Sequence, residues 1–177
     1  MIFTKTSLDG VVIIEPEAHS DDRGFFARVF CAKEIEEAGI KMTVSQINTS
    51  HNNEKNTLRG LHSQTPPHEE TKIVRCVKGA IFDVAVDVRL LSPTYGQFVS
   101  AELTADNGKM LVVPKGFAHG YLTLMDDTDV LYFVSEFYSP TNEKGYRFDD
   151  PVFQIDWPFQ KILTISEKDS SWPYIQE

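Results

Sequence analysis

Cysteine is scarce in this sequence, and acidic residues outnumber basic ones. Cys31 and Cys76 are the only two cysteines. They are too few for a disulfide framework and form no Cys-x-x-Cys zinc motif, so we expect two reduced thiols. The 17 Lys and Arg against 26 Asp and Glu leave a formal net charge of -9. Long-range repulsion therefore opposes binding to nucleic acid or to an anionic membrane, and a small anionic substrate would need a local basic cluster.

Long apolar runs are also missing. No stretch approaches the ~20 consecutive apolar residues that span a bilayer, and the opening residues MIFTKTSLDG lack the apolar core of a secretion signal. We therefore expect a cytoplasmic protein. The 177 residues, 41% hydrophobic and 24% charged, are typical of a globular chain. This length predicts a single domain over residues 1–177 with a substantial core.

Patterns that predict helices are rare. Ala32–Ala38 predicts one short helix, and Gly39 is placed to end it in a left-handed cap. From Ser139 onward, prolines among polar residues predict an extended tail that wraps the rest of the chain. The remaining regular segments are short β-prone runs between Gly, Pro, Asn or Asp: Val11–Glu15, Phe25–Phe30, Thr43–Thr49, Lys72–Val77, Ala80–Val88, Phe98–Leu103, Met110–Val113 and Val130–Tyr138. The chain is thus predicted to be an all-β sandwich or barrel.

Two of these runs alternate strictly. Residues 81–89 (IFDVAVDVR) separate a face of Phe and Val side chains from a face that carries Asp83. In residues 130–138 (VLYFVSEFY) the same period puts Tyr132, Glu136 and Tyr138 on one face. That face would offer two phenols and a carboxylate.

The segment GKMLVVPKGFAH, residues 108–119, matches the second half of the cupin pattern, in which Gly, Pro, Gly and His recur at fixed intervals around a strand and a turn. The glycines allow a tight backbone, and His119 would then point into a barrel. On this segment alone, a buried histidine that is satisfied by hydrogen bonds beside a turn is an equal alternative.

The first half of the cupin pattern, which normally completes a metal site with two His and a Glu, is broken. His62 is present, but Gln64 replaces the second imidazole, and Lys72 occupies the Glu position seven residues before Gly79. A protonated lysine cannot bind a cation and would repel one. We therefore expect no metal and no other cofactor, with a fixed positive charge in the place of the metal.

Such an exchange has a chemical meaning, because an ammonium group can stabilise an enolate much as a Lewis-acidic metal does. Removing a proton next to a carbonyl needs a base, an oxyanion partner and an acid. His62, Lys72 and Tyr132 could fill these roles. Two of these residues also have a structural alternative. Lys72 could be a solvated charge at the end of a strand, and Tyr132 could be a core aromatic.

An ordered set of motifs resembles the dTDP-4-dehydrorhamnose 3,5-epimerase family. The motifs are RGLHSQ at 59–64, KIVRCVKGAIFDVAVDVR at 72–89, SPTYG at 92–96, PKGFAHG at 114–120, Tyr132, FYSP at 137–140 and SEKD at 166–169. The resemblance covers nearly the whole chain, from about Ile13 to Asp169. It implies a cupin-type jelly-roll β-barrel that forms a homodimer and can lend an N-terminal strand to its partner.

The resemblance also implies roles for single residues. The family's base is the histidine of RGLH, oriented by the aspartate of the terminal motif, which implies a His62–Asp169 dyad. Carboxylate pairing would set the imidazole tautomer and raise its basicity. The family's lysine corresponds to Lys72 and its acid to Tyr132.

Further positions match the family's substrate-binding residues. They are Arg23, Gln46, Asn48, Arg59, His119, Tyr138, Glu143 and Lys168. Arg23, Arg59 and Lys168 would form the local basic cluster for a diphosphate.

The motifs depart from the family pattern at four positions: Arg28, Ile47, Ser63 and Phe133. These departures bear on the choice of sugar and base, whereas the proton-transfer residues are retained. Strict alternation would also put Arg59 and His62 on opposite faces of one strand, unless Gly60 bends it.

The resemblance implies an isomerase that removes a proton at C3, C5 or both of a nucleotide-linked 4-keto-6-deoxyhexose and returns it on the other face. In the family this step serves deoxysugar and surface-polysaccharide biosynthesis. The alternatives at this point are an epimerase of a single centre, a metal-dependent cupin oxygenase, which Lys72 disfavours, and a sugar-binding cupin without activity. Binding alone gives no reason to assemble a base, an orienting carboxylate, a cation and a phenol.

Overall fold

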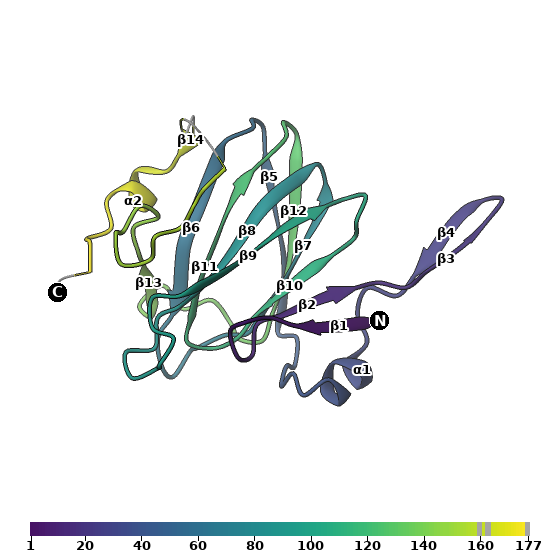
Figure 1. Ribbon diagram of the computed structural model, residues 1–177, viewed down its shortest axis with the longest axis horizontal. Coiled ribbons are helices and arrows are strands. Elements are labelled where there is room, and N and C mark those ends of the chain that lie inside the picture. The colour runs from purple at the N-terminus through teal and green to yellow at the C-terminus, as the bar shows by residue number, and fades with distance from the viewer. Residues whose placement is uncertain (159–160, 162–163, 176–177) are drawn as a thin grey trace.

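Two sheets face each other, antiparallel except for one short parallel strand, residues 164–165, and a small hairpin stands away from them (Figure 1). The structure, a computed structural model, describes residues 1–158, 161 and 164–175. The first sheet has the order β1-β2-β10-β7-β12-β5, and the second has the order β13-β6-β11-β8-β9, with β14 paired to β6. The elements are β1 (Ile2–Lys5), β2 (Val12–Glu15), β3 (Ala18–Asp21), β4 (Gly24–Ala27), α1 (Ala32–Glu37), β5 (Gln46–Asn52), β6 (Thr57–Gln64), β7 (Lys72–Lys78), β8 (Ala80–Asp87), β9 (Phe98–Thr104), β10 (Met110–Val113), β11 (Phe117–Thr123), β12 (Thr128–Val134), β13 (Glu143–Gly145), β14 (Thr164–Ile165) and α2 (Glu167–Ser170).

The inner faces of the two sheets form the central core. Val74 and Cys76 of β7 are fully buried there against Ile81 of β8 and Leu111 of β10. Because side chains alternate along a strand, the neighbours of these residues point to the outer faces. Polar side chains from both sheets interrupt this core and line the cavities described below.

Each sheet also has an apolar outer face, which another part of the chain covers. Helix α1 buries Ile35 against Ile73 of the first sheet. On the second sheet, Phe153 and Trp157 pack beside Val84 of β8, and Figure 1 shows the C-terminal segment passing next to β6. The predicted wrapping of the tail around the sheets is confirmed. Among the described residues, no helix is long and apolar enough to cross a membrane.

The predicted elements are present but differ at some ends. Helix α1 ends at Glu37, and Gly39 has a φ of +80°, as expected for a left-handed cap. Strand β12 ends at Val134, because its neighbour β5 begins opposite it at Gln46. Tyr138 therefore lies beyond the strand, and the predicted strand face shared by Tyr132 and Tyr138 is wrong.

Two central strands, β6 and β11, are not among the predicted runs. Each has a glycine in its interior, Gly60 in β6 and Gly120 in β11, and each carries polar residues that lower β propensity. The two strands pair with each other and place His62 opposite His119. The residues of greatest functional interest thus lie on strands with a weak sequence pattern.

Strands β3 and β4 form a hairpin that pairs with neither large sheet (Figure 1). Its aromatic side chains are unusually accessible, with Phe25 70% and Phe26 73% exposed. Arg23, at the turn, is paired with Asp21 of the same turn. The hairpin therefore presents two apolar rings and one cation away from the body of the chain.

Candidate active site

A polar cavity of about 470 Å³ lies between the sheets and adjoins a second cavity of about 260 Å³. Three residues line both: His62, Lys72 and Tyr132. His62 belongs to β6 of the second sheet, whereas Lys72 and Tyr132 belong to β7 and β12 of the first. The three residues predicted for proton transfer therefore meet where the cavities join, on opposite walls.

Helix α2 brings Asp169 to the imidazole of His62. Asp169 Oδ1 lies 2.6 Å from His62 Nε2, and Oδ2 accepts the backbone N–H of Gly60 at 3.1 Å. Ser166 caps the helix by accepting the N–H of Asp169 at 3.0 Å. Burial acts to raise the pKa of Asp169, but the hydrogen bonds from His62 and Gly60 outweigh it and keep that pKa below its ordinary value. The predicted contact is present, and Asp169 is a carboxylate that can stabilise an imidazolium.

Gly60 is the reason that Arg59 and His62 line the same cavity. Its φ of +114° is strained for residues with a side chain, and the register between β6 and β11 shifts between His119 and Tyr121. A Cβ at this position would lie only 2.6 Å from the Cα of the facing Gly120. The irregular backbone overrides strict alternation, as a β-bulge does.

Tyr132 faces the cavity from β12. Its Oη lies 2.9 Å from Ser50 Oγ, and its ring is edge-on to that of His119, with centroids 6.3 Å apart. Burial raises the pKa of Tyr132 well above its ordinary value. The phenol therefore keeps its proton at neutral pH, as an acid must.

Lys72 enters the cavity from the start of β7, where it pairs with Glu70. The two charged atoms are 3.1 Å apart, and the side chains are 14% and 12% exposed. The alternative of a solvated charge at a strand end is therefore wrong. Glu70 is not among the predicted site residues, although it lies two residues before Lys72 in the sequence.

His119 forms a second histidine–carboxylate pair deeper in the barrel. Its Nε2 lies 2.7 Å from Oδ1 of Asp83, which is fully buried. Burial raises the pKa of Asp83, although the nearby His119 and Lys72 act in the opposite direction. Asp83 lies on the polar face predicted for β8, but its place beside the cavity was not predicted.

The positions of the cupin metal ligands do not converge on one point. His62 and His119 are cross-strand neighbours, yet their Nε2 atoms face different carboxylates, Asp169 and Asp83. Gln64, in place of another imidazole, donates its amide to a backbone carbonyl. In the part of the chain that the structure describes, no group of three or more His, Cys, Asp or Glu side chains could hold a metal ion.

Most of the predicted substrate residues line one of the two cavities. The larger cavity has Arg59, His119 and Lys168, and the smaller has Gln46, Asn48, Tyr138 and Glu143. Lys168 Nζ lies 2.6 Å from Glu143 Oε1, and Tyr138 Oη donates to Glu143 Oε2 at 2.7 Å. The hydrogen bond to Glu143 raises the pKa of Lys168, so its ammonium group stays charged.

Arg23 does not join Arg59 and Lys168. It lies at the turn of the β3–β4 hairpin, with a side chain 89% exposed and an ion pair of 2.6 Å to Asp21. Figure 1 shows this hairpin extending away from both sheets. Because the hairpin pairs only with itself within the described chain, the predicted cluster of three basic residues is wrong for a single chain.

Of the four departures from the family motifs, Ser63 alone lines one of the two cavities of the candidate site, the smaller one. Phe133 packs on the outer face of the first sheet and stacks on Phe30, with ring centroids 5.6 Å apart. Ile47 lies opposite it on β5 and is 57% exposed. Arg28 is paired with a carboxylate of α1. In one chain, therefore, three of the four departures lie outside the two cavities.

Comparisons with known proteins agree with this site. A family model described as dTDP-4-dehydrorhamnose 3,5-epimerase matches residues 5–177. The dTDP-4-dehydrorhamnose 3,5-epimerase of Sinorhizobium fredii is 45% identical over 177 residues, which cover 100% of this chain and 91% of that protein. The crystal structure of dTDP-4-dehydrorhamnose 3,5-epimerase from Bacillus anthracis with TDP and PPi bound has a TM-score of 0.95 and 39% identity, and the match covers 98% of this chain and 99% of that one. A dTDP-6-deoxy-D-glucose-3,5-epimerase from Legionella pneumophila, in complex with dTDP-4-keto-L-rhamnose, has a TM-score of 0.91 and 38% identity, with 99% of both chains covered.

The two facing sheets form a cupin-type jelly roll, and a polar cavity lies between them in the middle of the core. The protein belongs to the isomerase class of enzymes. Within that class, the chain belongs to the dTDP-4-dehydrorhamnose 3,5-epimerase family. The family predicted from the motifs is thereby confirmed.

Proposed function

We propose that this protein converts dTDP-4-dehydro-6-deoxy-D-glucose into dTDP-4-dehydro-L-rhamnose by inverting C3 and C5 of the sugar. One observation carries the proposal: His62, held by Asp169, faces a cavity whose opposite wall presents Lys72 and Tyr132. Inversion requires the proton to leave one face of the ring and return on the other. Groups on opposite walls can perform those two steps.

The first step removes a proton from a carbon next to the ketone. Because Nε2 of His62 faces Asp169, Nδ1 accepts the proton. The C–H electron pair forms a C=C bond to the ketone carbon, and the π pair of the carbonyl moves onto its oxygen, which gives an enolate with negative charge on that oxygen. The ammonium group of Lys72 stabilises that oxygen, and Asp169 stabilises the imidazolium.

The second step returns a proton from Tyr132. The electron pair of the enolate forms the new C–H bond, and the O–H pair stays on the phenol oxygen as a phenolate. His62 then releases a proton to water and Tyr132 takes one from water, so no net proton is consumed. The same two steps at the other carbon give the second inversion. The sugar neither gains nor loses electrons overall, so no redox cofactor is required, and Lys72 supplies the positive charge that a Lewis-acidic metal would otherwise provide.

Arg59 and Lys168 hold the diphosphate of the substrate. The position of the two side chains supports this assignment, since both cations line the larger cavity of a protein whose net charge is -9. Guanidinium and ammonium groups form charge-assisted hydrogen bonds with phosphate oxygens. The smaller cavity, with the amides of Gln46 and Asn48 and the ring of Tyr138, suits the nucleoside.

The proposal includes a homodimer. Its support is the β3–β4 hairpin, where Phe25 and Phe26 are largely exposed and Arg23 is directed away from the chain's own cavities. Contact with a second copy would bury the two rings. It would also give Arg23 a role in the diphosphate site of the partner.

The proposal also places the reaction in the cytoplasm. Cys31 and Cys76 are both free thiols in the structure. Unpaired cysteines are typical of a reducing compartment.

Nuclear magnetic resonance in deuterated water tests the function directly. The protein is incubated with dTDP-4-dehydro-6-deoxyglucose and related 4-keto-6-deoxy nucleotide sugars, with and without a chelator. We expect deuterium at both C3 and C5, inversion at both centres, and no effect of the chelator. Label at one carbon would indicate an epimerase of a single centre. Binding without label would indicate a sugar-binding cupin, and activity lost to the chelator would indicate a metal enzyme.

A further inference from the structure

A chain of hydroxyl groups leads away from Tyr132 into the barrel. Tyr132 Oη lies 2.9 Å from Ser50 Oγ, and Ser50 Oγ lies 2.9 Å from Tyr121 Oη. Tyr121 Oη in turn lies 3.2 Å from Asn52 Oδ1. Tyr121 is 1% and Asn52 2% exposed, so the inner end of this chain is shielded from bulk water.

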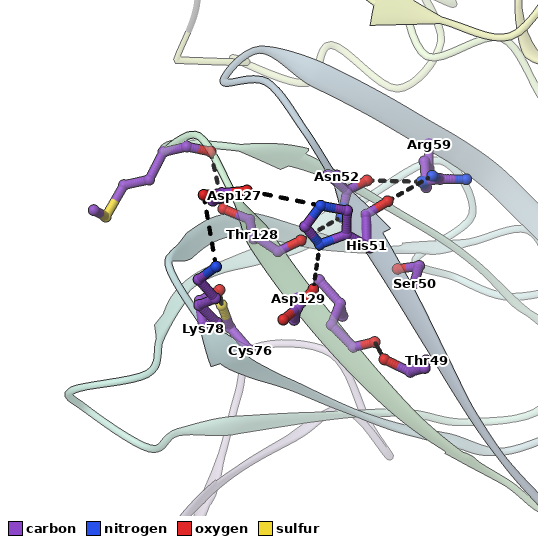
Figure 2. A network of polar contacts seen from close by, with 12 residues as sticks. Thr49, Ser50, His51, Asn52, Arg59, Cys76, Lys78, Asp127, Thr128 and Asp129 are labelled. Carbon is purple, nitrogen blue, oxygen red and sulfur yellow. Dashed lines mark hydrogen bonds and ion pairs between the residues drawn. The ribbon is translucent and has the colours of Figure 1, made fainter.

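Asn52 has only one orientation that satisfies its neighbours. Its Nδ2 donates to the backbone carbonyl of Thr128 at 3.0 Å, and its Oδ1 accepts from Nε of Arg59 at 2.8 Å. Figure 2 shows Asn52 between these two partners. A flipped amide would put an N–H against the guanidinium and a C=O against a carbonyl, so Oδ1 is the atom that faces Tyr121.

The fixed amide determines where each proton lies at rest. A carbonyl oxygen cannot donate, so Tyr121 donates its one proton to Asn52. Tyr121 then accepts the proton of Ser50, and Ser50 accepts the proton of Tyr132. At rest, the proton of Tyr132 therefore points toward Ser50 and not toward the cavity.

A second arrangement of the same hydroxyls keeps the two hydrogen bonds of Ser50 in the reverse direction and frees the proton of Tyr132 for a substrate. If Tyr121 turns its proton to Ser50, and Ser50 turns its proton to Tyr132, the proton of Tyr132 is released toward the cavity. Asn52 Oδ1 is not left without a partner, because Nε of Arg59 still donates to it. Three hydroxyl rotations, of Tyr121, Ser50 and Tyr132, convert Tyr132 from a donor within the network into a donor to a substrate, with no covalent bond broken.

We infer that Ser50 and Tyr121 are positioning residues for the acid step, and that reversal of their hydroxyl groups aims the proton of Tyr132 at the sugar and then stabilises the phenolate. This inference rests on the proposed function, in which Tyr132 is the acid. When the proton leaves Tyr132, its O–H electron pair stays on the oxygen, and Ser50 donates to that oxygen. The side-chain amide of Asn52 anchors the end of the hydroxyl chain but does not relay a proton. Water in the cavity returns the proton to Tyr132.

Electrostatics at Tyr132 show why such support is needed. Burial, and then the neighbouring Tyr121, raise the pKa of this phenol well above its ordinary value, whereas the hydrogen bond with Ser50 acts to lower it. A buried phenolate without a donor would be costly. A donor that turns toward the oxygen only when the charge forms stabilises the product of proton transfer more than the resting phenol.

The test compares Ser50→Ala, Tyr121→Phe and Ser50→Thr with the unaltered protein. Inversion and deuterium uptake are measured together on dTDP-4-dehydro-6-deoxyglucose in deuterated water. Loss of one hydrogen bond to a charged group lowers kcat for inversion about 10- to 100-fold. We expect this loss in Ser50→Ala and Tyr121→Phe, with KM within about twofold because the cations proposed to hold the diphosphate, Arg59 and Lys168, are retained. Deuterium uptake on the original face, which needs His62 but not the proton of Tyr132, should fall much less.

The ratio of deuterium uptake to inversion separates positioning from a structural role. A structural defect would lower both rates together, whereas loss of positioning raises the ratio. Ser50→Thr keeps a hydroxyl and should restore the ratio. Thr49→Ala, on the same strand but lining neither cavity, should change neither rate.

An unchanged ratio of deuterium uptake to inversion in both Ser50→Ala and Tyr121→Phe overturns this inference alone. A wild-type protein that takes up no deuterium from any ketosugar overturns the proposed function, and the inference with it.

Discussion

The two histidines of the cavity differ in their access to water. The side chain of His62 is 30% exposed and faces Asp169, whereas that of His119 is 5% exposed and faces the fully buried Asp83. A base must lose its proton to solvent after each turnover. His62 can do so directly, while His119 is better placed to hold a substrate group by a hydrogen bond.

Replacing His62 and Tyr132 should separate the two halves of the reaction. His62→Ala should abolish both inversion and deuterium uptake, because loss of a general base lowers the rate by about 10²–10⁴. Tyr132→Phe should still form the enolate through His62 and return deuterium to the original face, giving labelled but uninverted sugar. Nuclear magnetic resonance of the product measures both. Inversion by Tyr132→Phe at the wild-type rate would show that another group is the acid.

Arg59 should matter for binding more than for chemistry. Its Nε is held by Asn52 and its Nη2 by the carbonyl of His51, and Figure 2 shows both contacts. This anchoring directs a planar cation at the larger cavity. Arg59→Ala should raise KM about 10- to 100-fold, the loss of a charge-assisted phosphate contact, and weaken the salt dependence of binding. Steady-state kinetics at two ionic strengths provide the measurement.

An exposed cation is the matched control for Arg59. Lys78 lies at the end of β7, pairs with Asp127 at 3.6 Å and lines neither cavity. Lys78→Ala should therefore leave KM unchanged. Equal effects of Lys78→Ala and Arg59→Ala would mean that the net charge of the protein, and not a diphosphate site, controls affinity.

At the scale of elements, the bend of β6 depends on Gly60. In Gly60→Ala the new Cβ would meet Gly120 Cα at 2.6 Å and the carbonyl oxygen of His119 at 2.7 Å, at a φ of +114°. The facing atoms are backbone, so they cannot move aside cheaply. We expect a loss of about 2–4 kcal/mol in the free energy of unfolding, measured by urea denaturation. Activity should fall as well, because Arg59 and His62 flank the altered position.

Gly39 is the matched control for Gly60. It also has a positive φ, +80°, but a Cβ there meets nothing within 4 Å. Gly39→Ala should cost only about 1 kcal/mol, the strain of the left-handed conformation by itself. If the two variants were equally stable, close packing between β6 and β11 would not be what requires glycine.

The turn after β8 depends on the carboxylate of Asp87. This buried group accepts hydrogen bonds from Arg89, Ser92 and Thr94. Burial acts to raise the pKa of Asp87, but these bonds outweigh it and hold that pKa well below its ordinary value. Asp87→Asn should reduce the free energy of unfolding at pH 7 by about 1–3 kcal/mol.

The effect of Asp87 has a defined pH dependence. A carboxyl group whose pKa is lower in the folded than in the unfolded protein stabilises the fold above the unfolded pKa of about 3.9, and this contribution is lost as the pH falls below it. The gap between wild type and Asp87→Asn should therefore narrow below about pH 4. As a control, Asp149→Asn breaks an accessible pair with Arg147 and should cost less than about 1 kcal/mol. A gap that stays constant to pH 2 would contradict this assignment.

At the scale of the whole molecule, the hairpin is expected to hold two copies together. Sedimentation should give twice the 20.1 kDa mass of one chain. Replacing both Phe25 and Phe26 with Ser should shift the protein toward the monomer, because the rings account for the largest apolar area on the hairpin. Leu91→Ser, at a leucine that is 100% exposed elsewhere, should leave the mass unchanged. A wild-type monomer at micromolar concentration would remove the dimer from the proposal.

Local patterns in the sequence determined the β class, the single helix near the N-terminus and the family. Period-two alternation distinguishes a strand from a helix without knowledge of its partners, and motif order needs no coordinates. The same patterns identified His62, Lys72 and Tyr132, because Lys72 in a metal-ligand position changes the chemistry that the barrel can support. The structure brings these three together where two cavities join.

Only the tertiary structure decided which of the other residues belong with them. Arg59 lines the same cavity as His62 because β6 bends at Gly60 against β11, whereas Arg23 lies away from it because its hairpin pairs with neither sheet. The hydroxyl chain from Tyr132 through Ser50 and Tyr121 joins β5 to β11 and β12, where its partners lie 71 and 82 residues further along the chain. Such contacts depend on strand order and register, and these are set by packing between segments that no local periodicity relates.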